Sequence, residues 1–331
     1  MGIITGGTRQ GHEPELTGVV IRSSAGHLLV AVDGTIWRCQ MRGRLKRGKR
    51  QSQTVAVVGD RVRIGAQDPH AEPPRGVLEE VLPRTNRISR MAARRTGGHV
   101  EQVLMANLDQ VVAVQSIAEP RPQTGFVDRL LVAAERFGVA GVLVLNKADL
   151  PEPADQKTMW DYFVSMGYKV LRTSAETGQG GPQLADLLKD RVSLLIGASG
   201  VGKSSLLNLV EPGLRLRVGE VTGKTGLGRH TTTSTELFPL AGGGFIADSP
   251  GIRGFDPWAI APRDVRDYFP DFAEPQQACR FRTCLHRDEP VCGVKEAVAK
   301  GRIPRWRLAA YLSLLGDLEE RAERLGPRKR P

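Results

Sequence analysis

The spacing of hydrophobic residues changes twice along the chain and divides it into three parts. Between residues 16 and 82, apolar and polar residues alternate in short runs that Gly, Asp and Ser separate: TGVVIRSS, HLLVAVDG, TIWRCQ, TVAVVGDRVRIG and RGVLEEVLP. Short alternating segments between turn residues are typical of half-buried strands. The first part therefore predicts a small β-barrel of the OB type, which has about five strands.

From about residue 107 the pattern changes to apolar strands that alternate with helices. Strands are predicted in LDQVVAVQSI, GVLVLNKADL, YKVLRTSA, VSLLIGASG and GGGFIADSPG, and helices in VDRLLVAAERFG, DQKTMWDYFVSMG, PQLADLLKD and SSLLNLV. Continuous apolar strands are expected in a parallel sheet that is buried on both faces. The alternation predicts a three-layer α/β domain with a doubly wound sheet.

From about residue 258 the chain becomes irregular and then helical. Pro304 precedes RWRLAAYLSLLGDLEERAERLG, an amphipathic helix with Leu308, Leu312 and Leu315 on one side. We therefore expect a multidomain α/β protein. The expected parts are a tail (1–15), an OB-like barrel (16–85), an α/β domain (100–257), a C-terminal domain ending in a helix (258–325) and a basic tail (326–331).

The positive net charge of the chain indicates a polyanionic partner. The 331 residues carry a formal net charge of +11. Such an excess favours nucleic acid, although arginines that only aid solubility would give the same balance. Basic residues without an acid gather in MRGRLKRGKRQSQ, between the third and fourth runs of the barrel. We predict RNA contacts there rather than a merely solvated loop, through Arg42, Arg44, Lys46, Arg47, Lys49 and Arg50.

The hydrophobic pattern of the sequence does not suggest a membrane. No apolar run approaches the roughly 18 residues of a membrane span. The first residues, MGIITGGTRQ, lack the apolar core of a signal peptide. We expect a cytoplasmic monomer with no membrane partner.

Residues 197–204, GASGVGKS, match the phosphate-loop pattern in full. In such a loop, backbone N–H groups surround the phosphates, the Lys203 amine reaches the β and γ phosphates, and the Ser204 hydroxyl binds Mg²⁺. The following helix points its positive end at the anion. The predicted phosphate-binding residues are Gly197, Ala198, Ser199, Gly200, Val201, Gly202, Lys203, Ser204 and Ser205.

A second phosphate-facing segment follows downstream. In GGGFIADSPG we expect Asp248 to hold Mg²⁺ through water and the Gly251 amide to meet the γ-phosphate. The glycine-rich stretch before it, RVGEVTGKTGLGRHTTTSTEL, contains three adjacent threonines. One of Thr231, Thr232 and Thr233 would supply a second hydroxyl to Mg²⁺, and we take Thr232 as the candidate. Such a loop is ordered by the γ-phosphate and the metal.

The base of the nucleotide is predicted to be guanine. Asn146, Lys147 and Asp149 form the NKxD signature, in which the carboxylate accepts two N–H bonds that adenine does not offer. Thr173, Ser174 and Ala175 follow the next strand and look like the companion loop that meets the guanine oxygen. These loops precede the phosphate loop, the reverse of the ordinary order. A circular permutation explains this, because a packed sheet depends on strand neighbours and not on where the chain begins.

Four potential metal ligands lie within 14 residues near the C-terminus, Cys279, Cys284, His286 and Cys292. Four ligands with no open position fit one structural Zn²⁺, while a redox relay would not need the histidine. Arg280 and Arg282 interleave with them and are further candidates for RNA contact. Trp306 fits the core as well as a base-stacking surface.

The order of these motifs, between an OB-like barrel and a cysteine cluster, resembles one family, the bacterial ribosome small-subunit-dependent GTPase A. The stretch GRHTTT at 228–233 adds to the resemblance, which covers residues 16–325. The resemblance implies slow GTP hydrolysis to GDP, stimulation by the 30S subunit, and a role in late 30S maturation. It also implies contact with 16S rRNA and release of an assembly factor.

The residue that orients the attacking water is not the usual one. Many GTPases use a glutamine just after the DxxG glycine, and here that position is Ile252. His230 is the nearest polar candidate and we predict it as the catalytic residue, although a histidine that only packs or contacts RNA is the alternative. Two other functions stay open. A phosphate-loop kinase is disfavoured by NKAD. A nucleic-acid-binding module with a vestigial nucleotide site is disfavoured by the intact Asp149, Lys203, Ser204 and Asp248.

Overall fold

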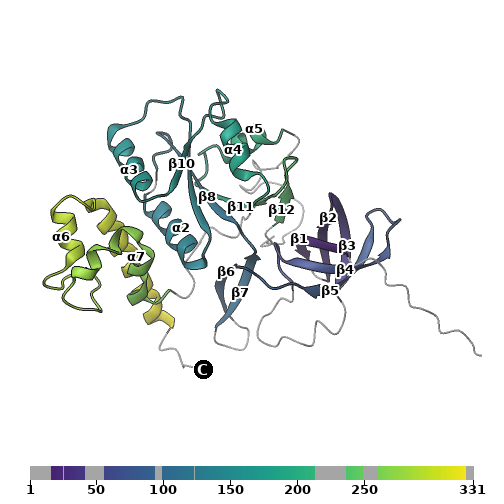
Figure 1. Cartoon of the computed structure of the whole chain (residues 1–331), viewed down its shortest axis with the longest axis horizontal. Helices are drawn as coiled ribbons and strands as arrows, with labels where there is room; N and C mark the ends of the chain where they lie inside the picture. Colours follow the sequence, from purple (N-terminus) through teal and green to yellow (C-terminus); the bar gives the residue numbers. More distant parts are fainter. Residues whose placement is uncertain are drawn as a thin grey trace, which may run out of the picture.

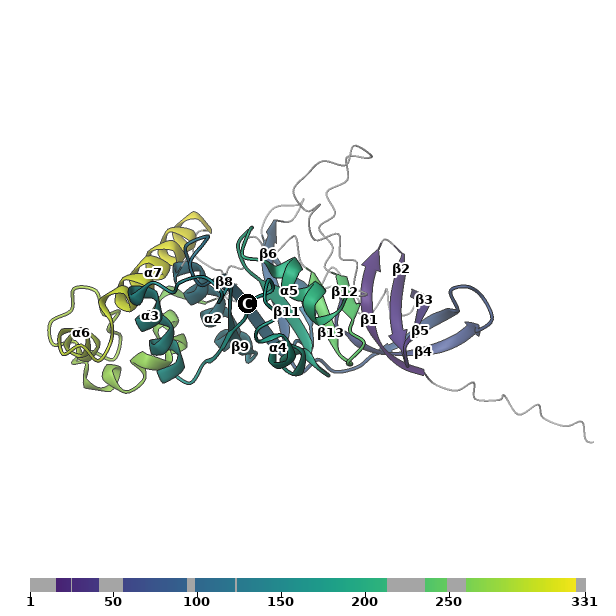
Figure 2. The same ribbon diagram turned by 90° about the horizontal axis from the view of Figure 1, so that it is seen from above.

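We describe a computed structural model of the chain, which covers residues 16–24, 26–41, 56–93, 99–122, 124–212, 236–248 and 260–325. Three parts follow one another along its long axis (Figures 1 and 2). A barrel lies at one end, an α/β sheet with its helices lies in the middle, and a mainly helical part lies at the other end. The predicted multidomain α/β fold is confirmed.

The barrel contains β1 (Leu16–Ser24), β2 (His27–Val32), β3 (Thr35–Met41), β4 (Arg61–Asp68) and β5 (Arg75–Val81). Strand β3 pairs in parallel with β5, the other pairs are antiparallel, and β4 returns to β1 and closes the barrel. This is the connectivity of a small Greek-key barrel of the OB type. Inward side chains such as Val30, Cys39 and Ile64 are fully buried.

The fourth predicted run, TVAVVGDRVRIG, is not one strand, because β4 begins only at Arg61. Gly59 turns the chain with a φ of 87°, and a Cβ there would lie 2.0 Å from the carbonyl oxygen of Ala106. The buried carboxylate of Asp60 accepts hydrogen bonds from the Val57 amide and the Arg84 guanidinium. In the turn before Gly59, Ala56 therefore packs in the barrel core, whereas Val58 packs against the cluster that contains Met105 and Val111.

The middle part has the predicted doubly wound sheet. Its strands are β8 (Gln110–Ser116), β9 (Ala140–Asn146), β10 (Lys169–Arg172), β11 (Val192–Ile196), β12 (Glu236–Pro239) and β13 (Phe245–Asp248). They are ordered β10-β9-β8-β11-β13-β12, and all neighbours are parallel except β12 and β13. The helices α2 (Thr124–Phe137) and α3 (Ala154–Ser165) cover one face, and α4 (Gly181–Leu188) and α5 (Lys203–Val210) cover the other.

The continuous apolar run of β8 follows from its central place in this sheet. Successive side chains of a strand point to opposite faces. Ala113 packs among residues of α2 and α3, whereas Val112 and Val114 pack among residues of α4 and α5. Both faces of β8 are therefore buried, and no polar alternation is possible.

The strand order defines where a ligand would bind. From β8 the chain proceeds through β9 to β10 on one side, while β11, β13 and β12 lie on the other. In open α/β sheets, ligands bind beyond the carboxyl ends of the strands where the order reverses. Here that point lies between β8 and β11, although β11 comes much later in the sequence. This is the strand arrangement that the permuted motif order requires.

The sequence did not predict two features of the fold. A hairpin of β6 (Arg87–Ala93) and β7 (His99–Ala106) joins the barrel to β8. In addition, Arg22 of β1 pairs with Glu236 of β12, both through the backbone register and through an ion pair. Barrel and α/β sheet are therefore hydrogen-bonded edge to edge.

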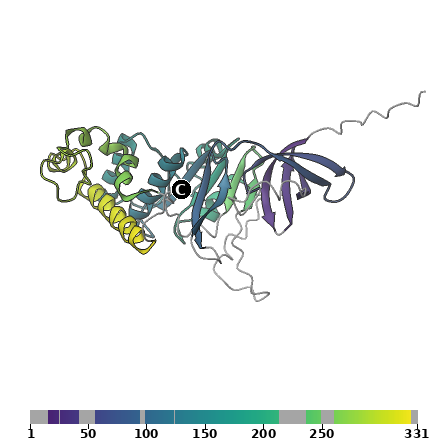
Figure 3. The ribbon, with the colours of Figure 1, turned by 90° about the horizontal axis from the view of Figure 1, so that it is seen from below.

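The C-terminal part has little regular structure before its last helices. It contains the 3-10 turns η2 (Pro262–Tyr268), η3 (Pro270–Phe272) and η4 (Pro275–Ala278), then α6 (Gly293–Ala299) and α7 (Arg305–Leu325), the long yellow helix of Figure 3. The buried face of α7 centres on Tyr311, Leu315 and Leu318, with Leu308 and Leu312 at its edge. Among the described helices, none has the length and apolar character that crossing a membrane requires.

Candidate nucleotide site and metal centre

Residues 197–204, the predicted phosphate loop, lie at the junction of β11 and α5. Gly200 and Gly202 both have positive φ angles, 82° and 88°, which side chains other than glycine rarely adopt. A Cβ on Gly197 would lie 2.3 Å from the carbonyl oxygen of Val114, so the loop passes directly over β8. The sequence therefore needs glycines here for close backbone approach as well as for turning.

Lys203 spans this loop from the first position of α5. Its amine donates hydrogen bonds to the carbonyl oxygens of Gly197 and Ala198, at 2.8 and 2.9 Å. Ser204 follows and is half-buried, whereas Ser199 and Ser205 are exposed. A cation and the amino end of a helix thus meet at one loop, which is a strong electrostatic setting for an anion.

Asn146, at the carboxyl end of β9, connects three loops. Its side-chain amide donates to the carbonyl oxygen of Val201 in the phosphate loop, at 2.8 Å. Its side-chain oxygen accepts from the Ala175 amide and the Thr173 hydroxyl, at 3.2 and 3.4 Å. The residue is almost fully buried. The base loop, the companion loop and the phosphate loop are therefore held to one another by a single side chain.

Asp149 lies exposed at the edge of this junction. One of its carboxylate oxygens accepts a hydrogen bond from the buried Ser174 hydroxyl. The backbone supports the same arrangement, since the Ala148 amide donates to the Thr173 carbonyl at 2.9 Å. The carboxylate keeps free acceptor positions, because two oxygens can accept about four hydrogen bonds. Such a group suits the two N–H donors of a guanine edge.

The Lys147 side chain makes a contact that the sequence did not indicate. Its amine donates to the carbonyl oxygen of Glu119, in the loop after β8, at 2.6 Å. The Ser116 hydroxyl donates to the same carbonyl at 2.6 Å. The loop that follows β8 thus becomes a fourth segment at the site. No motif in the sequence of that loop indicates this role.

Several predicted residues are not placed. Thr231, Thr232, Thr233, His230 and Gly251 lie outside the described residues, and so does the basic stretch from Arg42 to Arg50. Asp248 is the last residue of β13, and its backbone pairs with Glu236. It therefore lies at the carboxyl edge of the sheet, the same edge as the phosphate loop.

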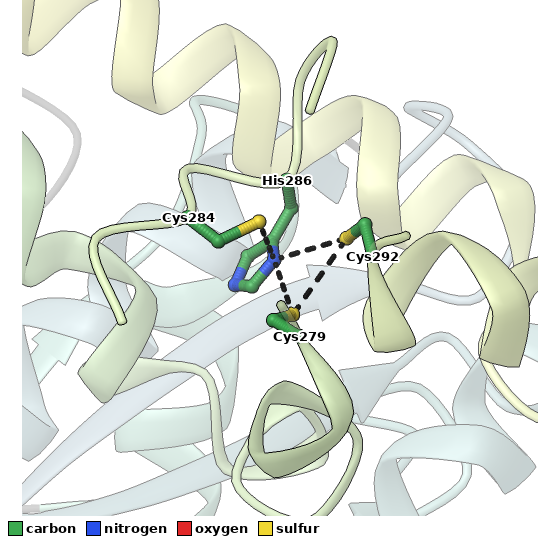
Figure 4. A group of neighbouring side chains, drawn as sticks. All are labelled: Cys279, Cys284, His286 and Cys292. Atoms are coloured by element: carbon green, nitrogen blue, oxygen red, sulfur yellow. Dashed lines mark hydrogen bonds between the residues drawn. The ribbon is translucent and has the colours of Figure 1, made fainter. Parts of the chain in front are cut away.

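The four predicted metal ligands come together in the C-terminal part (Figure 4). Cys279, Cys284, His286 and Cys292 each offer one ligand atom, and these atoms lie within 4.8 Å of one another. The three sulfurs lie 3.3, 3.4 and 3.6 Å from His286 Nδ1, and Cys279 and Cys292 Sγ lie 3.9 Å apart. A disulfide would need sulfurs at about 2.05 Å, so the three cysteines are free thiols.

This donor set fits Zn²⁺. Tetrahedral bonds of about 2.3 Å to sulfur and about 2.0 Å to nitrogen put the ligand atoms roughly 3.5–3.8 Å apart, close to the observed separations. Burial lowers the pKa of His286 to about 4, so the imidazole is neutral, as a ligand must be. Burial raises the pKa of Cys284 to about 12, a cost that metal binding would remove. The Lys295 amide donates to Cys292 Sγ at 3.4 Å, which would further support a thiolate.

The arginines beside this cluster differ in their surroundings. Arg280 and Arg282 are exposed, and the Arg280 guanidinium lies over the Phe281 ring. Arg287 is held by an ion pair with Glu319 of α7 at 2.7 Å. Trp306 packs at ring distances of 5.7 Å against Tyr162 and Phe163 of α3, so its surroundings are those of an interface core.

A buried charge cluster at the same interface was not foreseen. Arg307 of α7 is 1% exposed and makes ion pairs with Asp128 of α2 and Asp271 of η3. Its guanidinium also lies 4.3 Å from the centre of the Phe269 ring. Asp271 lies 36 residues and Asp128 lies 179 residues before Arg307, and nothing in RWRLAAYL distinguishes this arginine from its exposed neighbour Arg305.

Comparison with known proteins places this geometry in one family. The RsgA GTPase family model matches residues 81–258, and the RsgA N-terminal domain model matches residues 17–71. A small ribosomal subunit biogenesis GTPase RsgA of Gemmatimonas aurantiaca is 41% identical over 308 residues, 92% of this chain and 98% of its own. The protein of the same description from Moorella thermoacetica is 39% identical and covers 92% and 97%.

Solved structures agree in fold. The crystal structure of YjeQ from Thermotoga maritima superposes with a TM-score of 0.71 and 34% identity, covering 95% of this chain and all (100%) of that one. YloQ, described as a circularly permuted GTPase, superposes with a TM-score of 0.71 and 28% identity, covering 97% and 100%.

Proposed function

Because the chain belongs to the RsgA family of GTPases, we propose that it hydrolyses GTP in the biogenesis of the small ribosomal subunit. The observation that carries this function is the junction at Asn146, where the base, companion and phosphate loops meet through three hydrogen bonds. A vestigial site would not need to preserve contacts among three separate segments. A kinase that uses ATP would not need the carboxylate of Asp149 at the base.

The chemistry follows from the residues at this edge of the sheet. The Lys203 amine and the backbone amides of the phosphate loop would bind the phosphates, and Asp149 would select guanine. Mg²⁺, held by Ser204, Thr232 and Asp248, would neutralise the charge that develops on the phosphate oxygens. Catalysis here would rest on positioning and electrostatics, because the attacking nucleophile in GTP hydrolysis is water.

We further propose that intrinsic hydrolysis is slow and that the small subunit stimulates it. The position after Gly251 is Ile252, which cannot hydrogen-bond a water. His230 would orient the attacking water once the subunit has ordered its loop. In this proposal the protein acts late in 30S maturation, contacts 16S rRNA, and works as a monomer in the cytoplasm.

One structural Zn²⁺ would complete the C-terminal part. The donor set of three thiols and one imidazole leaves no open position, which argues against a catalytic metal. Arg280 and Arg282 are exposed beside it and would face rRNA phosphates.

The test is GTP turnover by the full-length protein with and without purified 30S subunits. We expect low turnover alone, a large increase with 30S, and no increase with 50S subunits. Lys203→Ala is the matched negative, because it removes the phosphate-binding amine from an otherwise intact fold. Equal turnover with and without 30S subunits would contradict the proposed dependence on the subunit.

A further inference from the structure

The loop after β8 reaches the nucleotide site through a turn that one buried serine holds. Ser116 is the last residue of β8, is fully buried, and is the register partner of Asn146 on β9. Its hydroxyl donates to the carbonyl oxygen of Glu119 at 2.6 Å and accepts from the Ala118 amide at 3.3 Å. A serine that bonds to its own backbone in this way closes a tight turn. The position of the Glu119 carbonyl is therefore set from the end of β8.

The same carbonyl receives the amine of Lys147, at a distance of 2.6 Å between the nitrogen and the oxygen. A hydrogen bond from a cation is stronger than one between neutral groups. Lys147 follows Asn146 directly, and its φ of 63° is uncommon for a residue other than glycine. The backbone of Lys147 thus belongs to the base loop, whereas its amine is held by the loop after β8. The stem of the side chain spans the two segments.

The far end of the loop after β8 has a weaker attachment. Arg121 pairs with Asp155 of α3 at 2.9 Å, and both side chains are exposed. Exposed ion pairs contribute little to stability. Between the two ends Pro120 borders the phosphate loop, since a Cβ on Gly200 would lie 4.0 Å from its Cδ. Ser116 is therefore the buried attachment of a loop that contacts both the base loop and the phosphate loop.

We propose that Ser116 is a positioning residue for guanine nucleotides. Its hydroxyl fixes the Glu119 carbonyl, which holds the Lys147 amine and so keeps the stem of that lysine in place before a nucleotide binds. A lysine side chain loses much rotamer freedom when it is immobilised. A protein that already holds the side chain in the free state avoids this loss on binding, and its affinity is higher.

The inference rests on the proposed function, in which the base that pairs with Asp149 lies against the Lys147 stem. Ser116 is buried and would act through Lys147 rather than by touching the nucleotide. Its effect belongs to the base end, which GTP and GDP share. A serine that only stabilised the end of β8 would alter the melting temperature and would show no link to Lys147.

The experiment compares full-length Ser116→Ala and Ser116→Cys with Ser193→Ala. The thiol of Ser116→Cys fills the place of the hydroxyl with a weak donor. Ser193 of the neighbouring strand β11 is equally buried, and its hydroxyl accepts from the Gln110 amide at 2.8 Å. Gln110 begins β8 and Ser116 ends it, so Ser193→Ala removes a buried hydroxyl from the same sheet at the opposite end. Titration with fluorescent GTP and GDP measures affinity, and thermal unfolding measures stability.

We expect both Ser116 variants to weaken GTP and GDP by the same factor, about three- to tenfold. Ser193→Ala should change either affinity less than about twofold, even where its melting temperature falls as far. The decisive measurement repeats Ser116→Ala in a Lys147→Met background, which keeps the apolar stem and lacks the amine. There the further loss should be less than about twofold, because the two residues act through one contact.

Three outcomes would overturn the proposal. They are Ser116 variants that bind nucleotide like Ser193→Ala, a loss that persists undiminished in the Lys147→Met background, and a loss confined to GTP. Failure of the proposed function looks different, because it shows in the wild-type protein. There the unmodified chain would bind no guanine nucleotide, or would bind ATP as tightly as GTP.

Discussion

The contacts of Asn146 explain why the first residue of NKAD is an amide and not an acid. Its nitrogen faces the Val201 carbonyl and its oxygen faces the Ala175 amide, so the side chain must both donate and accept. An aspartate would set a carboxylate oxygen against the Val201 carbonyl, 2.8 Å away in the native contact. A buried polar group without its partner costs about 1–3 kcal/mol. The junction therefore depends on the donor and acceptor pattern rather than on side-chain size.

Guanine selectivity is predicted to rest on Asp149. In Asp149→Asn one acceptor oxygen becomes a donor, so GTP binding should weaken by about 1–3 kcal/mol. Xanthine nucleotide, whose base edge is changed to suit, should then bind better than GTP. Fluorescent-nucleotide titration measures both. Glu176→Gln is the control, because this exposed acid lies in the companion loop and makes no described contact with Asp149. Unchanged GTP affinity in Asp149→Asn would refute the assignment.

Water positioning is predicted to rest on His230. A neutral imidazole can accept a hydrogen bond from water, so His230→Ala should keep nucleotide and 30S binding but lose most of the stimulated turnover. Single-turnover hydrolysis with saturating subunits measures this step. Loss of about 10²–10⁴-fold is the usual range for removing such a group. Full stimulation in the variant would exclude His230 from this role.

At the scale of elements, the C-terminal part shows why a metal is expected. Its hydrophobic cluster draws on short 3-10 turns and two helices, and two of its buried members, Cys284 and Cys292, are potential ligands. The His286 ring contacts Phe272 and Tyr311, edge to face at 5.6 Å and tilted at 5.9 Å. Short turns have few internal hydrogen bonds to hold them. Zn²⁺ would therefore link the segment that carries Cys279 to the start of α6.

Removing one ligand is predicted to unfold this segment and leave the α/β domain intact. Cys284→Ser should lose the zinc, which elemental analysis should find at about one per wild-type chain. Zinc–peptide sites contribute on the order of 10 kcal/mol to folding, so proteolysis should become rapid around residues 279–292. Cys39→Ala should keep the metal, because Cys39 is buried in the barrel. Zinc-free wild-type protein would contradict the prediction.

Elements with a regular period could be predicted from the sequence, and those fixed by distant contacts could not. The continuous apolar residues of β8 and the apolar face of α7 reflect which side chains of each element are buried. Their predicted positions therefore agree with the structure. The β6–β7 hairpin did not stand out, because its residues lack clear alternation. The strand expected from residue 54 was broken at Gly59, whose close neighbour is the carbonyl of Ala106 far along the chain. The candidate site motifs could be found in the sequence because phosphate and metal chemistry demand fixed residues at fixed spacing, and the structure brings Asn146 to the phosphate loop and the four potential metal ligands together.

At the scale of the whole molecule, one buried cation joins the α/β domain to the C-terminal part. Arg307 lies between Asp128 and Asp271, and all three are at most 5% exposed. The Tyr162 hydroxyl donates to Asp271 at 3.0 Å and adds α3 to the contact. The sequence could not reveal this cluster, because its charges come from three separate elements. The cluster therefore connects the C-terminal part to both α2 and α3 of the α/β domain.

The cluster also makes stability depend on pH. Burial raises the pKa of Asp128 to about 6, with Arg307 opposing and Asp271 adding to the shift. In the unfolded chain the pKa of an aspartate is about 3.9. Between these values the folded state binds more protons, so the free energy of unfolding should fall as the pH rises from about 4 to about 6. Asp128→Asn should remove this component, which urea unfolding at several pH values measures.

The last prediction separates this cluster from ordinary surface pairs. Arg307→Met keeps an unbranched apolar stem but leaves two buried carboxylates without a cation, so the unfolding free energy should fall by about 3–5 kcal/mol. The two acids would then compete for one proton, and the loss should be larger at pH 8 than at pH 5.

Arg129→Gln is the matched control, because Arg129 pairs with Asp317 across the same two helices but is one-third exposed. It should cost less than about 1 kcal/mol. Urea unfolding followed by tryptophan fluorescence reports on this interface through Trp160 and Trp306. Equal losses of unfolding free energy in the two variants would show that burial of the charge does not determine how strongly the cluster stabilises the contact between α2 and α7.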